Sequence, residues 1–270
     1  MDFSGPALIM AIVNCNEDSF YPPSRALRDE AVRRALSAEE EGASIVDFGG
    51  ESTRPGFVPV REEDELRRVI PVIEAFRKRS SLPVSVDTRK AKVAREALAA
   101  GADIINDISS LTDDPLMAEV CAETGAAVVL MHSRDITKMP AGTLAGEVGA
   151  FLKAAGERAI AAGIQKGKII VDPGIGFGKD LRGNLEILRR LPYLAEICGK
   201  DYPLLVGLSR KSFIGEITGQ DVLERLPGTL AANGAAIMDG ADIIRVHDVK
   251  EHRDLVKMLY ALRREPPQGQ

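Results

Sequence analysis

Polar side chains of the types that bind and convert ligands follow a series of short apolar runs along the chain. Carboxylates and amides at these positions suit a flat heterocycle with ring N–H groups, and cations suit an anion such as a diphosphate. The polar groups that follow the runs are Asn14, Glu51-Ser-Thr-Arg54, Asp87-Thr-Arg, Asn106-Asp107, Met131-His132, Asp172-Pro-Gly, Ser209-Arg-Lys-Ser212 and Arg245-Val-His-Asp248. Together they predict a ligand in which a heterocycle is joined to a diphosphate.

Helix capping is the alternative explanation for each of these groups taken alone. Asp87, Asp107 and Asp248 each precede a predicted helix, where a short carboxylate can accept from the first backbone N–H groups. Capping does not explain why every run ends in this way. We therefore expect a ligand site built from the whole set.

The glycine-rich run Asp172-Pro-Gly-Ile-Gly-Phe-Gly-Lys179 resembles a phosphate-binding loop at first sight. A Walker A motif would need glycine where Pro173 stands and Ser or Thr where Asp180 stands, so ATP binding is not predicted. The glycines allow the backbone to approach a ligand, with Phe177 as an aromatic wall. A tight turn with a packed phenylalanine is the alternative.

The elements that must position these residues are short strands alternating with helices. Glycines such as Gly42, Gly101, Gly125 and Gly240 each end an amphipathic stretch and precede a β-branched run, as a helix C-cap before a buried strand does. The expected strands are 8–13, 45–48, 84–86, 104–106, 128–131, 169–171, 204–206 and 243–246. Such an alternation predicts an α/β fold, a (β/α)8 TIM barrel with its site at the carboxyl ends of the strands. An open doubly wound sheet is the alternative.

Composition narrows the class of protein. With 270 residues the chain fits one barrel domain over residues 1–264, followed by a disordered tail over 265–270. A net charge of -5, with no long basic run, argues against nucleic acid as a partner. The three cysteines lack a CxxC pattern and fit reduced thiols. With neither a signal peptide nor a membrane span expected, the predicted location is cytoplasmic.

The polar strings, in this order, resemble the dihydropteroate synthase family of pterin-binding enzymes over nearly the whole chain. The matching runs are Gly49-Gly-Glu-Ser-Thr-Arg-Pro-Gly56, Ser85-Val-Asp-Thr88, Asn106-Asp-Ile108, Leu130-Met-His132, Asp172-Pro-Gly-Ile-Gly-Phe-Gly-Lys179, Ser209-Arg-Lys-Ser212 and Arg245-Val-His-Asp248. The family has the barrel fold that the strand count predicts.

The resemblance implies a transferase that condenses 6-hydroxymethyl-7,8-dihydropterin diphosphate with p-aminobenzoate, releasing dihydropteroate and diphosphate with the help of Mg²⁺. It implies catalytic roles for Lys211, Arg245, His247 and Asp87. The implied pterin residues are Asp87, Asn106, Met131, Asp172, Gly207 and Lys211. The implied diphosphate residues are Asn14, Arg54, Arg245 and His247, with Asn14 also reaching the metal. The implied p-aminobenzoate residues are Thr53, Pro55, Phe177 and Ser212.

Several further polar residues have positions that allow more than one role. Asp47 could orient Arg54 or Asn14 or make a structural hydrogen bond. His132 carries no clear role, and Lys179 and Arg210 could be surface charges. His252 lies in a charged helical stretch and is expected to be solvated.

The segment from Cys15 to Arg25 departs from the family pattern, which usually has Thr-Pro and glycine-rich stretches there. Two prolines, Pro22 and Pro23, stiffen it, so its effect on p-aminobenzoate binding stays open. The segment 133–140 after His132 departs as well.

Two rival functions remain: a methyltetrahydrofolate-dependent methyltransferase and a catalytically silent pterin-binding paralogue. A methyltransferase has no use for the cations Arg54, Arg245 and His247. The altered first loop motivates the silent paralogue. The resemblance also implies a homodimer.

Overall fold

All eight predicted strands are present, close to their expected bounds. The computed structural model describes residues 3–15, 25–51, 60–199 and 201–263. The strands are β1 (Leu8–Asn14), β2 (Ile45–Gly49), β3 (Val84–Asp87), β4 (Ile104–Asp107), β5 (Ala127–Met131), β6 (Ile169–Asp172), β7 (Leu205–Val206) and β8 (Ile243–Val246).

These strands form one parallel sheet that curls almost onto itself. Their order is β6-β5-β4-β3-β2-β1-β8-β7, and an isolated bridge between Val171 and Leu204 joins the two outer strands. The nearly closed sheet confirms the (β/α)8 TIM barrel and excludes the open doubly wound alternative.

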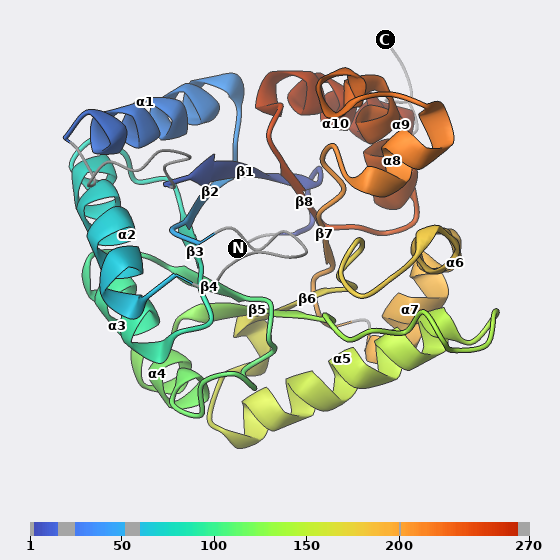
Figure 1. Cartoon of the computed structure of the whole chain (residues 1–270), viewed down its shortest axis with the longest axis horizontal. Coiled ribbons are helices and arrows are strands. Elements are labelled where there is room, and N and C mark those ends of the chain that lie inside the picture. The colour runs from blue at the N-terminus through green and yellow to red at the C-terminus, as the bar shows by residue number, and fades with distance from the viewer. Residues whose placement is uncertain (1–2, 16–24, 52–59, 200, 264–270) are drawn as a thin grey trace, which may run out of the picture.

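Helices surround the strands as a ring (Figure 1). They are α1 (Arg25–Glu41), α2 (Glu62–Arg77), α3 (Ala91–Ala99), α4 (Met117–Thr124), α5 (Leu144–Ala161), α6 (Leu181–Arg189), α7 (Leu191–Cys198), α8 (Ser212–Thr218), α9 (Leu226–Met238) and α10 (Val249–Arg263), with short 3-10 turns η1 (Lys166–Lys168) and η2 (Val222–Glu224). Among the described residues, none of these helices combines the length and apolar character needed to cross a bilayer.

Two hydrophobic clusters hold the barrel together. The larger cluster lies between the strands and the helices, where buried side chains such as Phe48, Val86 and Leu130 pack outward. The smaller cluster fills the barrel interior, and its largest members include Met10, Ile45, Ile104, Val129, Ile170, Leu205 and Ile243. A strand turns successive side chains to opposite faces, so the residue two positions after each interior side chain also points inward.

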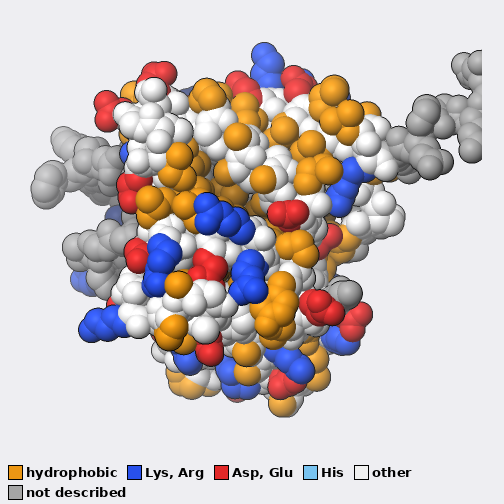
Figure 2. Space-filling view, turned by 90° about the vertical axis from the view of Figure 1, so that its right-hand side faces the viewer, with side chains coloured by type: hydrophobic (Ala, Val, Ile, Leu, Met, Phe, Trp, Pro, Cys, Tyr) orange, Lys and Arg blue, Asp and Glu red, His pale blue; other side chains and the backbone are white. Residues whose placement is uncertain are grey.

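The protein surface mixes charges of both signs. On the face shown in Figure 2, Lys and Arg side chains are interspersed with Asp and Glu, so neither sign dominates it. The three cysteines are free, as the sequence predicts.

Candidate active site

The polar site is the layer of interior side chains directly above the apolar one. Ile45, Ile104 and Ile243 belong to the interior cluster, and two residues further along their strands stand Asp47, Asn106 and Arg245. The same step leads from Ile170 to Asp172 and from Leu205 to Gly207. Strand alternation therefore gathers residues from five strands at the carboxyl end of the barrel.

Arg245 is the centre of this layer. Its Nε donates to Asp47 Oδ2 at 2.6 Å and its Nη2 donates to Asp87 Oδ2 at 3.1 Å. Asn106 Nδ2 donates to the same Asp47 oxygen at 3.2 Å. The cation thus ties β8 to β2 and β3 and fixes both carboxylates.

Each of the two carboxylates keeps one oxygen for a ligand. Within the part of the chain that is described, Oδ1 of Asp47 and Oδ1 of Asp87 are buried and have no hydrogen-bond partner. A buried acceptor without a donor is unfavourable, so a ligand with N–H groups would relieve both.

Burial shifts the protonation of these groups. Loss of solvent raises the pKa of Asp87 to about 7, the charge of Arg245 works against that rise, and the charge of Asp47 adds to it. Burial also raises the pKa of Asp172, against the lowering effect of Lys211. Burial lowers the pKa of Arg245, but Asp47 and Asp87 outweigh it and raise that pKa overall, so the guanidinium stays charged.

Lys211 stands beside the loop that follows β6. Its Nζ donates to the carbonyl oxygen of Ile175 and lies 4.7 Å from the centre of the Phe177 ring. Burial lowers the pKa of Lys211 to about 8, while Asp172 holds it up. Gly207 lies between the two cations, since a Cβ there would be 3.9 Å from both Arg245 Cβ and Lys211 Nζ.

The loop after β6 lies directly on the loop after β5. Gly174 has φ +67°, and a Cβ there would stand 1.9 Å from the carbonyl oxygen of His132. The nitrogen of Gly174 also donates to Asp172 Oδ1 at 2.7 Å. Only glycine satisfies both the backbone angle and the close approach. The turn that glycine allows places its backbone N–H where it holds the carboxylate of Asp172.

Lys179 joins the same two loops and is not a surface charge. Its side chain is buried, and Nζ lies 3.0 Å from His132 Nδ1, 2.9 Å from His132 O and 2.8 Å from Phe177 O. Burial lowers the pKa of Lys179 to about 7 and that of His132 to about 3. The alternative that Lys179 is a surface charge is therefore wrong, because its four-carbon stem carries the amine inward.

His247 lies at the exposed rim of β8, next to the loop after β7. Ser209 Oγ accepts from the His247 backbone N at 3.2 Å and lies 2.9 Å from His247 Nδ1. A hydroxyl that donates to Nδ1 leaves the ring hydrogen on Nε2, where it can donate to an anion.

His252 and Arg210 correct two further expectations. The side chain of His252 is fully buried between α10 and α9, with Nδ1 2.6 Å from Asp248 O and Nε2 2.9 Å from Asn233 Nδ2. The prediction that His252 is solvated is wrong, because it lies on the inner face of α10. Arg210 forms a bidentate ion pair with Asp248 and is not a free surface charge.

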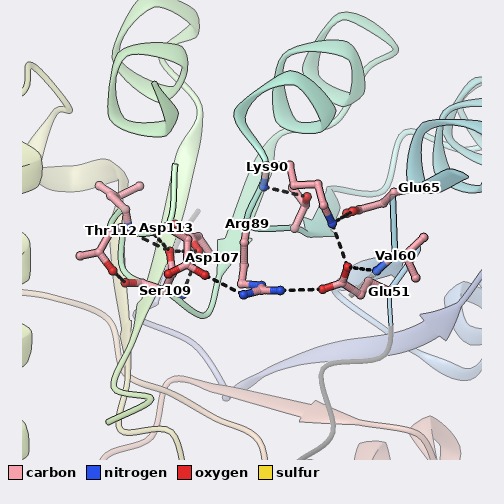
Figure 3. A network of polar contacts seen from close by, with 11 residues as sticks. Glu51, Val60, Glu65, Arg89, Lys90, Asp107, Ser109, Thr112 and Asp113 are labelled. Atoms are coloured by element: carbon pink, nitrogen blue, oxygen red, sulfur yellow. Dashed lines mark hydrogen bonds and ion pairs between the residues drawn. The ribbon is translucent and has the colours of Figure 1, made fainter. Parts of the chain in front are cut away.

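A network of charged residues, which the sequence did not reveal, lies at the ends of β2 and β3 (Figure 3). Glu51 is buried and binds Arg89 Nη2, Lys90 Nζ and the backbone N of Val60, each at 2.8 Å. Lys90 also pairs with the fully buried Glu65. Glu51 therefore joins the end of β2 to Val60 and to the residues that follow β3.

The remaining predicted residues divide into three groups. Asn14 is exposed at the end of β1, Ser212 is exposed at the start of α8, and Met131 is buried at the end of β5. Thr53, Arg54 and Pro55 lie outside the described residues. Asp47 hydrogen-bonds to Arg245 and Asn106, in agreement with the alternative of a structural hydrogen bond, and its other suggested partner Arg54 lies outside the described residues.

A barrel with a carboxylate-lined, cation-centred rim defines a class of enzyme that binds a polar heterocycle. The family model described as "Pterin binding enzyme" matches residues 10–247. The chain belongs to this family of pterin-binding enzymes.

Two relatives within the family carry the same name. The chain is 42% identical over 270 residues to dihydropteroate synthase of Synechocystis, covering 97% of this chain and 92% of that one. It is 44% identical over 268 residues to dihydropteroate synthase of Escherichia coli K12, covering 97% and 93%.

Solved structures agree with the sequence relatives. Dihydropteroate synthase of Xanthomonas albilineans with 4-aminobenzoic acid has a TM-score of 0.89 and 42% identity, covering 98% of this chain and 95% of that one. The same enzyme in complex with 7,8-dihydropteroate has a TM-score of 0.86 and 40% identity, covering 98% and 97%.

Proposed function

We propose that this protein is a dihydropteroate synthase, which joins 6-hydroxymethyl-7,8-dihydropterin diphosphate to p-aminobenzoate. The observation that carries the proposal is the pair of oxygens on Asp47 and Asp87 that have no partner among the described residues. Arg245 fixes both carboxylates, and the chain is 42% identical to a dihydropteroate synthase solved with 4-aminobenzoic acid. The relatives share the fold and the name over nearly the whole length of this chain.

The pterin half of the substrate would lie in the carboxylate layer. Asp87 and Asp172 supply acceptors for ring N–H groups, and Asn106 supplies both an amide donor and an acceptor. Lys211 stands beside Asp172 with a lowered pKa, and Gly207 leaves room next to it. Met131 at the end of β5 offers an apolar contact for the ring.

The diphosphate half would lie towards Arg245 and His247, with Asn14 and Arg54 as its further partners. Breaking the carbon–oxygen bond moves its electron pair onto the leaving diphosphate. Fixed donors that meet this growing charge stabilise the transition state more than the substrate. Arg245 is held in place by two carboxylates before any substrate arrives, so little reorganisation is needed.

The donor set suits a magnesium ion held mainly by the substrate. Among the described residues, no group of three or more His, Cys, Asp or Glu side chains could hold a metal. Mg²⁺ characteristically keeps several waters and binds phosphate oxygens with one or two protein oxygens, and the exposed amide of Asn14 can supply one. When bound, Mg²⁺ would neutralise charge on the leaving diphosphate.

The second half of the reaction forms a carbon–nitrogen bond. Loss of diphosphate leaves a positive methylene that the electron-rich dihydropterin delocalises. The neutral arylamine donates its lone pair to this carbon and then loses a proton to solvent or diphosphate. Phe177, Ser212, Thr53 and Pro55 are the proposed p-aminobenzoate contacts.

An assay separates this proposal from its rivals. Purified protein is incubated with the pterin diphosphate, Mg²⁺ and p-aminobenzoate, and both diphosphate and dihydropteroate are measured, with each substrate omitted in turn. Equal amounts of both products are expected. Tight pterin binding without either product would establish the silent paralogue. Diphosphate release without dihydropteroate would show that the p-aminobenzoate pocket does not bind its substrate productively. A methyltransferase is disfavoured by the relatives, which are named synthases.

Two further properties belong to the same proposal. Exposed apolar side chains on neighbouring elements support a homodimer, and they include Ile217, Leu223, Met238, Met258 and Leu262. Figure 2 shows hydrophobic side chains gathered on this side of the molecule. Small, soluble substrates fit a cytoplasmic location and require neither nucleic acid nor a membrane.

A further inference from the structure

Arg210 has an unusual backbone conformation directly before Lys211. Its φ is +55°, and the only other described non-glycine residues with positive φ are Ser110 and Leu111. A side chain with a Cβ disfavours this left-handed region, so the surrounding structure must hold it there. The strain lies at the position that sets the direction of both Lys211 and Ser212.

Hydrogen bonds hold the Arg210 backbone from two sides. Its N donates to Thr229 Oγ1 at 3.1 Å, and its O accepts from Arg225 Nη1 at 3.1 Å. Arg225 in turn packs on α8, since a Cβ on Gly215 would lie 2.4 Å from Arg225 Nη2. Arg225 therefore contacts both the turn at Arg210 and helix α8.

The Arg210 guanidinium binds the segment that follows β8. Nε and Nη2 donate to the two oxygens of Asp248 at 2.9 and 2.7 Å. Nη1 donates to the carbonyls of Val222 and Leu223 at 3.0 and 2.6 Å. Asp248 follows His247 directly, so the ion pair spans from the residue next to Lys211 to the residue next to His247.

We propose that the Arg210–Asp248 ion pair is a positioning device for catalysis. It fixes Lys211 at the pterin end of the site relative to His247 at the diphosphate end, so that both meet the substrate at a set separation. Ser209, bonded to His247, makes a second cross-connection between the same loops. This inference rests on the proposed synthase function.

The test compares Asp248→Asn with Asp103→Asn. Asp103 pairs with Arg77 at the amino end of the barrel, so it is a control for the loss of an Asp–Arg ion pair away from the site. The two arginines are equally exposed, at 21%, whereas Asp103 is 53% exposed and Asp248 is 19% exposed. Asp248→Asn is expected to lower kcat roughly 10- to 100-fold, because small displacements of reacting groups cost that much. Asp103→Asn should leave kcat within about twofold, whatever its effect on the Tm.

Two further variants test whether the pair acts as one unit. Arg210→Lys keeps the charge but loses the two-pronged contact, and is expected to have an intermediate kcat. Arg210→Gly removes the guanidinium and relieves the positive φ, so it should fold stably and still be slow. The double variant Arg210→Gly with Asp248→Asn should be no slower than the worse single variant.

The kinetics of wild type test the proposed function, and the kinetics of the variants test the positioning role. A wild type without synthase activity would reject the proposed function and leave no kcat to compare. Active wild type together with unchanged kcat in Arg210→Gly or Asp248→Asn would overturn the positioning role. Equal loss of kcat in Asp103→Asn would also overturn it, because general destabilisation would then explain the effect.

Discussion

Arg245 Nε donates to Asp47 Oδ2 at 2.6 Å, although the two residues are 198 positions apart in the chain. The contact joins the last strand to the second and crosses the barrel interior at the layer where the substrate would lie. It makes Asp47 a residue that orients the central cation.

Asp47→Asn removes the charge that holds Arg245 and keeps the shape of the side chain. Arg245 keeps Asp87 as a partner, so we expect a loss of about 1–3 kcal/mol in the free energy of unfolding. We expect kcat/KM for the pterin diphosphate to fall by about tenfold or more, because the guanidinium is no longer fixed. Urea unfolding and steady-state kinetics measure the two effects. Asp113→Asn, an exposed carboxylate at the same rim, is the control.

Asp87 should make stability and pterin affinity depend on pH in opposite directions. Burial raises its pKa in the folded protein to about 7, well above the value of about 4 for an unfolded aspartate. Between these values the folded state binds more protons, so the contribution of Asp87 to stability falls as pH rises through this window. Affinity for the pterin should rise as the carboxylate becomes charged.

The measurement compares wild type with Asp87→Asn from pH 5 to pH 8. The variant lacks this titration, so its stability relative to wild type should increase across the range. A constant difference between the two proteins would contradict the shifted pKa.

Lys179 should make stability depend on pH in the direction opposite to Asp87, and Lys179→Met tests this. Burial lowers the pKa of Lys179 to about 7, below the value of about 10.4 for an unfolded lysine. The unfolded state therefore binds more protons between these values, and the contribution of Lys179 to stability rises with pH through that window. The free energy of unfolding of wild type, relative to that of Lys179→Met, is expected to rise from pH 7 to pH 10.

Loss of the three contacts of Lys179 should also release Phe177, because Nζ holds its carbonyl oxygen. KM for p-aminobenzoate is therefore expected to rise more than KM for the pterin diphosphate. Lys166→Met, which removes an exposed ion pair with Asp201, is the control and should change neither.

Gly174→Ala tests the close approach of the two loops against a matched glycine. Gly125 has a nearly identical φ of +66°, but a Cβ there would meet nothing within 4 Å. Gly125→Ala should therefore cost only about 1 kcal/mol for the backbone angle. Gly174→Ala adds a collision with His132 O, so we expect a loss several kcal/mol larger and little activity. Equal losses in the two variants would show that the contact is not needed.

Much of the fold and the rim follows from the sequence. Short apolar runs ended by polar groups are enough to predict the strands, and the two-residue alternation of a strand explains why Asn106, Asp172 and Arg245 share the interior. That alternation also places Asp47 inside, two residues after Ile45, and could have shown that it faces the central cation.

Other features needed three-dimensional contacts. Lys179 and His252 have charged or polar neighbours in sequence, and only the packing of a loop or a helix face shows that they are buried. The positive φ of Arg210 could not be predicted from the sequence, because arginine rarely adopts this backbone conformation. The network around Glu51 joins residues whose side chains meet only after β2 and β3 pair.

The isolated bridge between Val171 and Leu204 makes the β6–β7 boundary the least hydrogen-bonded seam in the described part of the barrel wall. Phe177 and Lys211 follow these two strands, and Lys211 reaches across the seam to the carbonyl of Ile175. This contact in the site therefore stabilises the barrel between β6 and β7, where the sheet would separate most readily. Substrate that engages both loops would slow amide exchange in β7, linking occupancy of the site to integrity of the wall.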